Sequence, residues 1–186
     1  MKRICLAVLT LVCLIAVTAV AAENEKSRLS AKLDGLQEVA IPTVITDATG
    51  TFKATVNDDS TITYTLTYKN LSSAVLQAHI HIGATKLSGG VSIFLCTNLG
   101  NGPAGTPACP DDATHSGSVS RTVSAADVVG PSGQGVAAGD LKDVVRAIAS
   151  HVTYANVHTK NFPAGEIRGQ IRQHGDDEDD ELPGAR

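Results

Sequence analysis

The stretch TGTFKATVNDDSTITYTLTYK, residues 49–69, decides the fold. On each side of a short polar segment, NDDS at 57–60, apolar residues alternate with threonine and other polar residues. The alternating apolar residues are Phe52, Ala54, Val56, Ile62, Tyr64, Leu66 and Tyr68. Strict alternation is typical of β-strands that bury one face, and a short turn joins two such strands into a hairpin. The stretch therefore predicts an antiparallel hairpin with one apolar side and one polar side.

Similar short segments follow along the chain, separated by turns rich in glycine, proline and asparagine. They are VLQAHIHI (75–82), GGVSIFLC (89–96), SGSVSRTVS (116–124), HVTYANVHT (151–159) and GEIRGQIRQ (165–173). One segment has a different period. In GDLKDVVRAIAS (139–150) apolar residues recur at helical spacing, and Asp140 is placed as the N-cap. We predict an all-β domain, an antiparallel β-sandwich or barrel with one or two short helices.

The first 22 residues have the features of a secretory signal peptide. Lys2 and Arg3 precede an uncharged apolar run, and AVA at 19–21 is a small-residue cleavage site. A retained membrane anchor is the alternative, because the run is near the lower limit for spanning a bilayer. We expect a signal peptide at 1–22, a β-sandwich domain at 23–175 and a secreted or periplasmic protein. We expect no membrane association after cleavage.

The charge distribution disfavours one class of partner. The chain has 15 basic and 19 acidic residues, and six of the acids form the run DDEDDE at 176–181. Without that run and the basic start, the body is close to neutral and has no basic run, so we do not expect nucleic acid as a partner. A run of like charges without apolar residues does not form a core. We therefore interpret residues 176–186 as an acidic disordered tail.

Two cysteines, Cys96 and Cys109, lie beyond the predicted signal peptide. An even number of cysteines in an exported chain is typical of disulfide bonding. The residues between them, TNLGNGPAGTPA, are turn-forming, and a disulfide closing this loop stabilises the fold by about 3 kcal/mol in the chain-entropy model. A two-thiol metal site is the alternative, with less support because neither cysteine has a partner at zinc-finger spacing.

Three histidines are candidate metal ligands. Alternation in QAHIHIG (77–83) places His79 and His81 on the face opposite the apolar residues, about 6–7 Å apart along the strand. His158 lies in a similar context in YANVHT (154–159). Imidazole nitrogens suit copper and zinc, and a third histidine from a neighbouring strand completes a plausible set of ligands. We therefore expect copper or zinc at His79, His81 and His158, bound more tightly above about pH 7 than below pH 6, because imidazole ligands must be neutral.

Other polar residues are expected near this site if the strands are neighbours, which the pattern does not establish. Asn156, Glu166 and Arg168 are predicted to face outward and to support the ligands as hydrogen-bonding partners. His115, in the loop DDATHSG, is a candidate fourth ligand that we interpret as an ordinary loop residue. The alternative for the whole set is a solvated sheet face on which the histidines bind no metal.

Catalysis has less support than binding. The chain has no Gly-x-Ser-x-Gly motif, and no reactive cysteine remains once Cys96 and Cys109 pair. Glu166 beside Arg168 is typical of a surface ion pair or a structural brace rather than of a general base. We identify no catalytic residues and expect a binding protein rather than an enzyme.

Four segments carry a resemblance to a known family. They are LDGLQEV (33–39), ATGTFKATVNDDSTITYTLTYKNLS (48–72), AHIHIG (78–83) and YANVHTKNFPAGEIRGQI (154–171). Their order and spacing resemble the CHRD (chordin) domain, a module found in secreted microbial proteins, from about Leu29 to Arg172. The chain departs slightly near Val39, where family members often have proline. The resemblance implies an exported Greek-key β-sandwich or barrel, of superoxide-dismutase-like or immunoglobulin-like form, and leaves the activity open.

Two functions from different classes follow. The first is an exported metal-binding protein. The second is an extracellular module that contacts a protein or a glycan without metal. The His-x-His segment also resembles the copper strand of copper/zinc superoxide dismutase, which makes a metalloenzyme a further alternative. The zinc loop and bridging histidine of that enzyme have no counterpart here, so dismutase activity is not our expectation.

Overall fold

The structure, a computed structural model, describes residues 27–39, 43–58 and 60–174. The predicted signal peptide at 1–22 and the predicted tail at 176–186 lie outside the described residues. The strands are β1 Ser27–Asp34, β2 Thr49–Val56, β3 Ile62–Lys69, β4 Val75–Ile82, β5 Gly90–Thr97, β6 Gly117–Val123, β7 Thr153–Thr159, β8 Ile167–Gln170 and β9 Arg172–His174. The described helices are α1 Leu141–Ala149 and the 3-10 turns Gly35–Gln37, Ala125–Asp127 and Ser132–Gln134.

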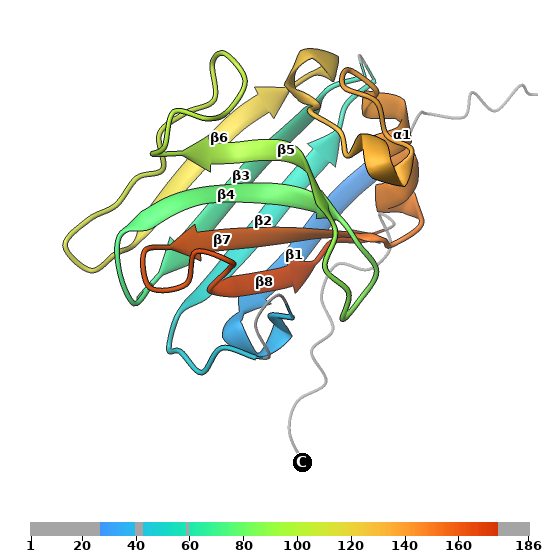
Figure 1. Ribbon diagram of the computed structural model, residues 1–186. Helices are drawn as coiled ribbons and strands as arrows, with labels where there is room; N and C mark the ends of the chain where they lie inside the picture. Colours follow the sequence, from blue (N-terminus) through green and yellow to red (C-terminus); the bar gives the residue numbers. More distant parts are fainter. Residues whose placement is uncertain (1–26, 40–42, 59, 175–186) are drawn as a thin grey trace, which may run out of the picture.

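The strands form one antiparallel sheet in the order β5-β4-β7-β8-β1-β2-β3-β6, and β9 extends the pairing of β1. Figure 1 shows that the sheet curls, so that β4, β5, β7 and β8 form a layer in front of β1, β2, β3 and β6. The hydroxyl of Tyr64 on β3 donates to the carbonyl oxygen of Leu95 on β5 and joins the two layers across the core. The predicted all-β sandwich or barrel is confirmed.

The hairpin predicted from residues 49–69 is confirmed in register. β2 and β3 pair antiparallel from Thr49 opposite Lys69 to Val56 opposite Ile62. Along β3, buried and exposed residues alternate without exception, as the sequence pattern requires. Phe52 and Tyr64 stack with 6.2 Å between ring centroids inside the core.

The predicted helix is also confirmed. The side chain of Asp140 accepts a hydrogen bond from the amide of Asp143 and caps the first turn of α1. Leu141, Val144 and Ile148 are buried, and Figure 1 shows the helix at one end of the two layers. Within the described residues, no helix has the length and apolar character that crossing a membrane requires.

The two cysteines form the predicted disulfide. Cys96 lies at the end of β5 and Cys109 lies in the following loop, 13 residues away. Asn98 holds the same loop, because its side-chain amide donates to the carbonyl oxygens of Val75 and Cys109 and its oxygen accepts from the amide of Cys109. The loop is therefore fixed covalently and by hydrogen bonds, and the alternative of a two-thiol metal site is wrong.

The face of the sheet that points away from the core has two different halves. On β1, β2 and β3 it is open, and the outward residues are exposed or half-buried. On β7 all seven residues are buried, including those that the alternation places outward. Glu166 and Arg168 are buried, so the interpretation of the two as a surface ion pair is wrong. The alternative of a solvated face around the histidines is also wrong, because connecting segments cover this half of the sheet.

Candidate metal centre

The three candidate histidines lie together on the covered half of the outer face. β4 and β7 are neighbours, with His79 opposite Asn156 and Gln77 opposite His158. The rings of His79 and His81 contact each other, so both project from the same side of β4, as the alternation of side chains requires. One ligand nitrogen from each of the three imidazoles lies within 4.8 Å of the other two. The structure therefore brings together residues 79 positions apart in the sequence.

The three rings form a compact triangle. The ring centroids of His79 and His158 are 5.0 Å apart, those of His79 and His81 are 5.4 Å apart, and those of His81 and His158 are 5.9 Å apart. The rings are mutually tilted rather than stacked on one another. Their nitrogens can therefore point into a common space.

Backbone carbonyls fix which nitrogen carries the proton in two of the rings. His81 Nδ1 donates to the carbonyl oxygen of Gly89 at 2.9 Å, and His158 Nδ1 donates to that of Pro163 at 3.0 Å. Because a carbonyl oxygen only accepts, the proton lies on Nδ1 in both rings and Nε2 keeps its lone pair. A metal-binding histidine commonly has its other nitrogen held in this way.

The remaining nitrogens are short of partners. His79 Nδ1 lies 3.2 Å from His158 Nε2, which is a hydrogen bond between two neutral rings. Nε2 of His79 and Nε2 of His81 are buried and have no hydrogen-bond partner among the described residues. A buried polar atom without a partner costs about 1–3 kcal/mol, so two such atoms in one cluster need an explanation.

Burial keeps the three rings uncharged. The exposed fractions of His79, His81 and His158 are 2%, 8% and 6%. Burial, together with the neighbouring imidazoles, lowers the pKa of His79 to about 2. Burial also lowers the pKa of His81 and of His158 to about 4, although the hydrogen bonds to Gly89 and Pro163 act in the opposite direction. All three rings are therefore neutral, which is the form that binds a metal, across the physiological pH range.

Aromatic side chains and a loop cover the cluster. The rings of His79 and of Phe94 on β5 meet edge to face, with 4.4 Å between centroids, and His81 stacks on Tyr154. The Tyr154 hydroxyl accepts a hydrogen bond from the amide of Gly89. At Gly89 a Cβ atom would lie 1.7 Å from the carbonyl oxygen of Ile82, so only glycine allows this approach. The loop at 83–89 is thereby held against the histidines.

Asn156 and Arg168 lie beside the cluster, as expected. Asn156 is opposite His79 on one side and Arg168 on the other, so the three share one row across β4, β7 and β8. The Arg168 guanidinium lies over the Tyr154 ring and donates to the carbonyl oxygens of Ala84 and Leu87. Arg168 therefore holds the covering loop in place.

Glu38 is a residue of the site that the sequence did not indicate. Its carboxylate accepts a hydrogen bond from the Asn156 side chain, and burial raises its pKa to about 7. Gly165 makes room for this contact, because a Cβ there would lie 2.6 Å from the Glu38 carboxylate, and its φ of +134° also favours glycine. The segment LDGLQEV gave no periodic signal that singles out this glutamate.

Glu166 is fully buried and binds groups other than the histidines. Its carboxylate accepts from the Thr46 hydroxyl, the Ser72 amide and hydroxyl, and the Thr159 hydroxyl, at 2.7–2.9 Å. These donors come from three separate segments, so the carboxylate ties them together next to the end of β7. Its described contacts are those of a structural brace.

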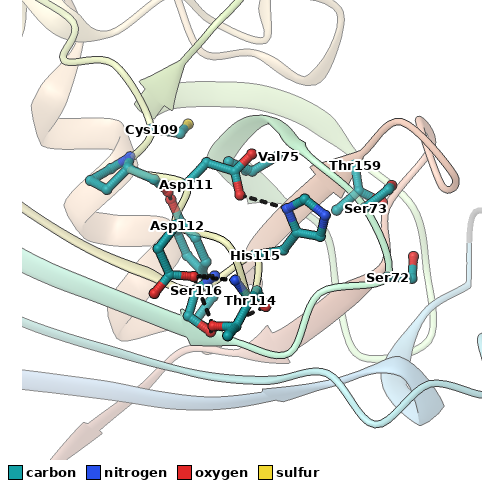
Figure 2. A network of polar contacts seen from close by, with 12 residues as sticks. Ser72, Ser73, Val75, Cys109, Asp111, Asp112, Thr114, His115, Ser116 and Thr159 are labelled. Atoms are coloured by element: carbon teal, nitrogen blue, oxygen red, sulfur yellow. Dashed lines mark hydrogen bonds and ion pairs between the residues drawn. The ribbon is translucent and has the colours of Figure 1, made fainter.

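His115 lies away from the cluster. Its Nδ1 is 2.9 Å from the Asp111 carboxylate in the loop before β6, as Figure 2 shows. In the same view Asp112 accepts hydrogen bonds from Thr114 and Ser116, which close the loop. The interpretation of His115 as a loop residue agrees with these contacts.

Most of the chain, including the strands of the histidine cluster, matches a known protein family. A protein-family model described as "CHRD domain" matches residues 29–171, well over half of the chain. The match includes every strand residue that contributes to the histidine cluster. No curated protein and no solved structure matches the chain.

Proposed function

The chain belongs to the CHRD domain family, and we propose that it binds one copper or zinc ion through His79, His81 and His158. The observation that carries the proposal is the pair of buried Nε2 atoms, on His79 and His81, that have no partner among the described residues. A bound cation would take up both lone pairs and remove the cost of leaving them unsatisfied. The tautomers fixed by the Gly89 and Pro163 carbonyls support the same role.

The residues present fit such an ion. Three neutral imidazoles suit copper and zinc, whereas magnesium and calcium prefer oxygen ligands. Metal–nitrogen bonds of about 2.0–2.1 Å place two ligand nitrogens about 4.2 Å apart at most, so rings whose nitrogens are up to 4.8 Å apart must close slightly on binding. Side-chain rotation can supply this movement, and it must also break the hydrogen bond from His79 Nδ1 to His158 Nε2, because that nitrogen holds the only lone pair of His158. A bound ion would supply a Lewis-acidic or redox-active centre, and we assign it no reaction.

Neighbouring residues would tune the site. We propose that Asn156 and Arg168 act on the ligands indirectly, Asn156 through its place beside His79 and Arg168 through the Tyr154 ring and the covering loop. Glu166 would contribute by holding the end of β7, from which His158 projects. No ligand role is proposed for it.

A metal titration tests the proposal. Protein purified without a histidine tag is stripped with chelator and titrated with zinc and, separately, with copper, for the native chain and for His79→Ala, His158→Ala and His115→Ala. We expect one ion per chain in the native protein and in His115→Ala, and at least a hundredfold weaker binding in the other two variants. Native protein that binds neither ion, or variants that bind as the native chain does, would contradict the proposal. A folded, metal-free protein would then favour a protein- or glycan-binding module.

We also propose that the protein is exported, to the periplasm or outside the cell. The Cys96–Cys109 disulfide supports an oxidising compartment, because disulfides are rare in the cytosol. The apolar segment before residue 22 supports the same conclusion. Sequencing the N-terminus of protein recovered from its native source tests it. A mature chain that begins close to Glu23 is expected, and a chain that retains Met1 would contradict it.

A further inference from the structure

The open half of the outer face, on β1, β2 and β3, is concave and lies away from the three candidate ligands His79, His81 and His158. Two hollows of about 510 Å³ each lie on β1, β2 and β3, one lined by Lys53 and Thr65 and the other by Lys32 and Thr67. Hydroxyls of neighbouring strands are bonded to one another here, Thr63 to Thr122 at 2.9 Å and Thr65 to Ser120 at 2.8 Å. The face is therefore an ordered surface of hydroxyl groups.

The register gathers basic residues on this face. Ser30 lies opposite Lys53 on one side and Arg172 on the other, Lys32 lies opposite Thr51, and Lys69 lies opposite Thr49. The basic face is defined by its five cations, which are Arg28, Lys32, Lys53, Lys69 and Arg172. In the described strands β1, β2, β3 and β9 it has one carboxylate, Asp34, which already accepts two hydrogen bonds from Gln37. The sequence has no basic run that would indicate this face, because the sheet assembles its cations from four separate strands.

The acidic segment of the chain begins at the edge of this face. His174, the last residue of β9, lies opposite Arg28, lines one of the hollows and is 2.6 Å from the Ser30 hydroxyl. Six consecutive carboxylates follow at 176–181. Seven extended residues from His174 reach up to about 25 Å. Strands are about 4.8 Å apart, so β3 lies about 14 Å from β9 across the sheet, and Lys69, level with Asp34, lies about 20 Å further along the strands. Lys53 and Lys32 are therefore well within reach, and Lys69, about 25 Å away on the diagonal, is at the limit of the extended segment.

We propose that residues 176–181 of the same chain occupy the basic face, with their carboxylates against its lysines and arginines. An exposed ion pair contributes at most about 1 kcal/mol, so no single pair decides the contact. Attachment at His174 gives the segment an effective concentration in the millimolar range, and several weak pairs then act together. The contact is screened by salt, because its charges lie near solvent. It covers the face against external polyanions.

Carbodiimide cross-linking of the full chain tests the contact directly. The reagent joins a carboxylate to a lysine amine that touches it, and trypsin releases all six carboxylates in the fragment 173–186. At low salt we expect cross-links within one chain to Lys53, Lys69 or Lys32, about tenfold above those to the exposed control Lys160, because the segment is tethered beside them. At 1 M salt they should disappear. Links spread evenly over all lysines, or links only between two chains, would overturn the proposal.

Binding to a sulfated polysaccharide column gives a second readout. Replacing the six acids by their amides (Asp176→Asn, Asp177→Asn, Glu178→Gln, Asp179→Asn, Asp180→Asn and Glu181→Gln) should uncover the basic face and raise the salt needed for elution. Adding Lys53→Gln and Lys69→Gln to that variant should remove the gain. A native chain retained as strongly as the amide variant would overturn the proposal, and so would a gain that survives the two lysine changes. Neither test involves metal, so its outcome is independent of the proposed metal site.

Discussion

The ring of Tyr154 lies parallel to the imidazole of His81, with 4.8 Å between the centroids and 7° between the planes. The Arg168 guanidinium carbon lies 3.4 Å from the centroid of the same tyrosine ring. These three residues come from the neighbouring strands β7, β4 and β8, so the contacts join the strands on their outer side. A candidate ligand is thereby held by an aromatic ring, and the ring in turn is held by a cation that fastens the covering loop.

Removing the Tyr154 ring should therefore destabilise the fold and loosen His81. Tyr154 is 4% exposed, and Tyr154→Ala should lower the free energy of unfolding by about 3–5 kcal/mol, as for other buried aromatic residues. Tyr154→Phe keeps the ring and loses only the hydroxyl, which accepts from the Gly89 amide and donates weakly to the Gly89 carbonyl oxygen, so it should cost about 1 kcal/mol. Urea unfolding of both variants provides the measurement. Equal losses in the two variants would show that the stacked ring contributes little.

Metal affinity should be nearly independent of pH between about 7.5 and 5.5. Unperturbed imidazoles would lose affinity between pH 7 and 6, as expected from the sequence. Burial lowers the pKa of His81 and His158 to about 4 and that of His79 to about 2, so protons compete with the ion only at lower pH. Titrations at several pH values, in buffers that do not bind the metal, measure this dependence. A tenfold loss of affinity between pH 7 and 6 would contradict the buried arrangement.

Glu38→Gln should stabilise the protein at alkaline pH. The pKa of Glu38 is about 7 in the folded protein and about 4.5 in the unfolded chain, so the folded state holds the proton more tightly. The associated stability is present below pH 4.5 and is lost as the pH rises through 7. Glutamine keeps an acceptor for the Asn156 amide and has no charge to bury.

Thermal unfolding of native protein and Glu38→Gln at pH 4.5 and pH 8 measures the effect. The free energy of unfolding of the variant minus that of the native protein should be higher at pH 8 than at pH 4.5, by up to about 3 kcal/mol. A difference that is the same at both pH values would mean that the Glu38 carboxyl titrates normally.

Glu166→Ala should lower the free energy of unfolding and leave the number of metal ions bound per chain unchanged. It removes an acceptor for four donors from three segments, and leaving buried donors unsatisfied should cost about 3–5 kcal/mol. As a control, Asp143→Ala breaks the exposed ion pair with Arg146 and should cost about 1 kcal/mol or less. Chemical unfolding and metal analysis are measured on the same samples. A stable variant that has lost its metal would instead make Glu166 a direct partner of the ligands.

Much of the fold could be predicted because local patterns were strong. Alternation in 49–69 fixed the hairpin and its buried face, and the helical period with Asp140 fixed α1 and its start. The same alternation correctly placed His79 and His81 on one side of β4, where their rings contact each other. That His158 is their neighbour could not be read from the pattern, because strand order depends on contacts between distant segments.

Burial of the outer face could not be predicted, because alternation shows which way a side chain points and not what covers it. The cover depends on Gly89, on the Tyr154 and Arg168 side chains and on the segment that carries Glu38. The basic face was missed for a related reason. Its cations are single residues on four strands, and only the register brings them together.

Anomalous diffraction tests the central claim most directly. Crystals of the tag-free protein grown with zinc or copper are measured above and below the absorption edge of the metal. We predict one anomalous peak per chain, about 2 Å from a nitrogen of each of His79, His81 and His158. Electron density that shows the three rings in place with no anomalous peak among them, at saturating metal, would contradict the account.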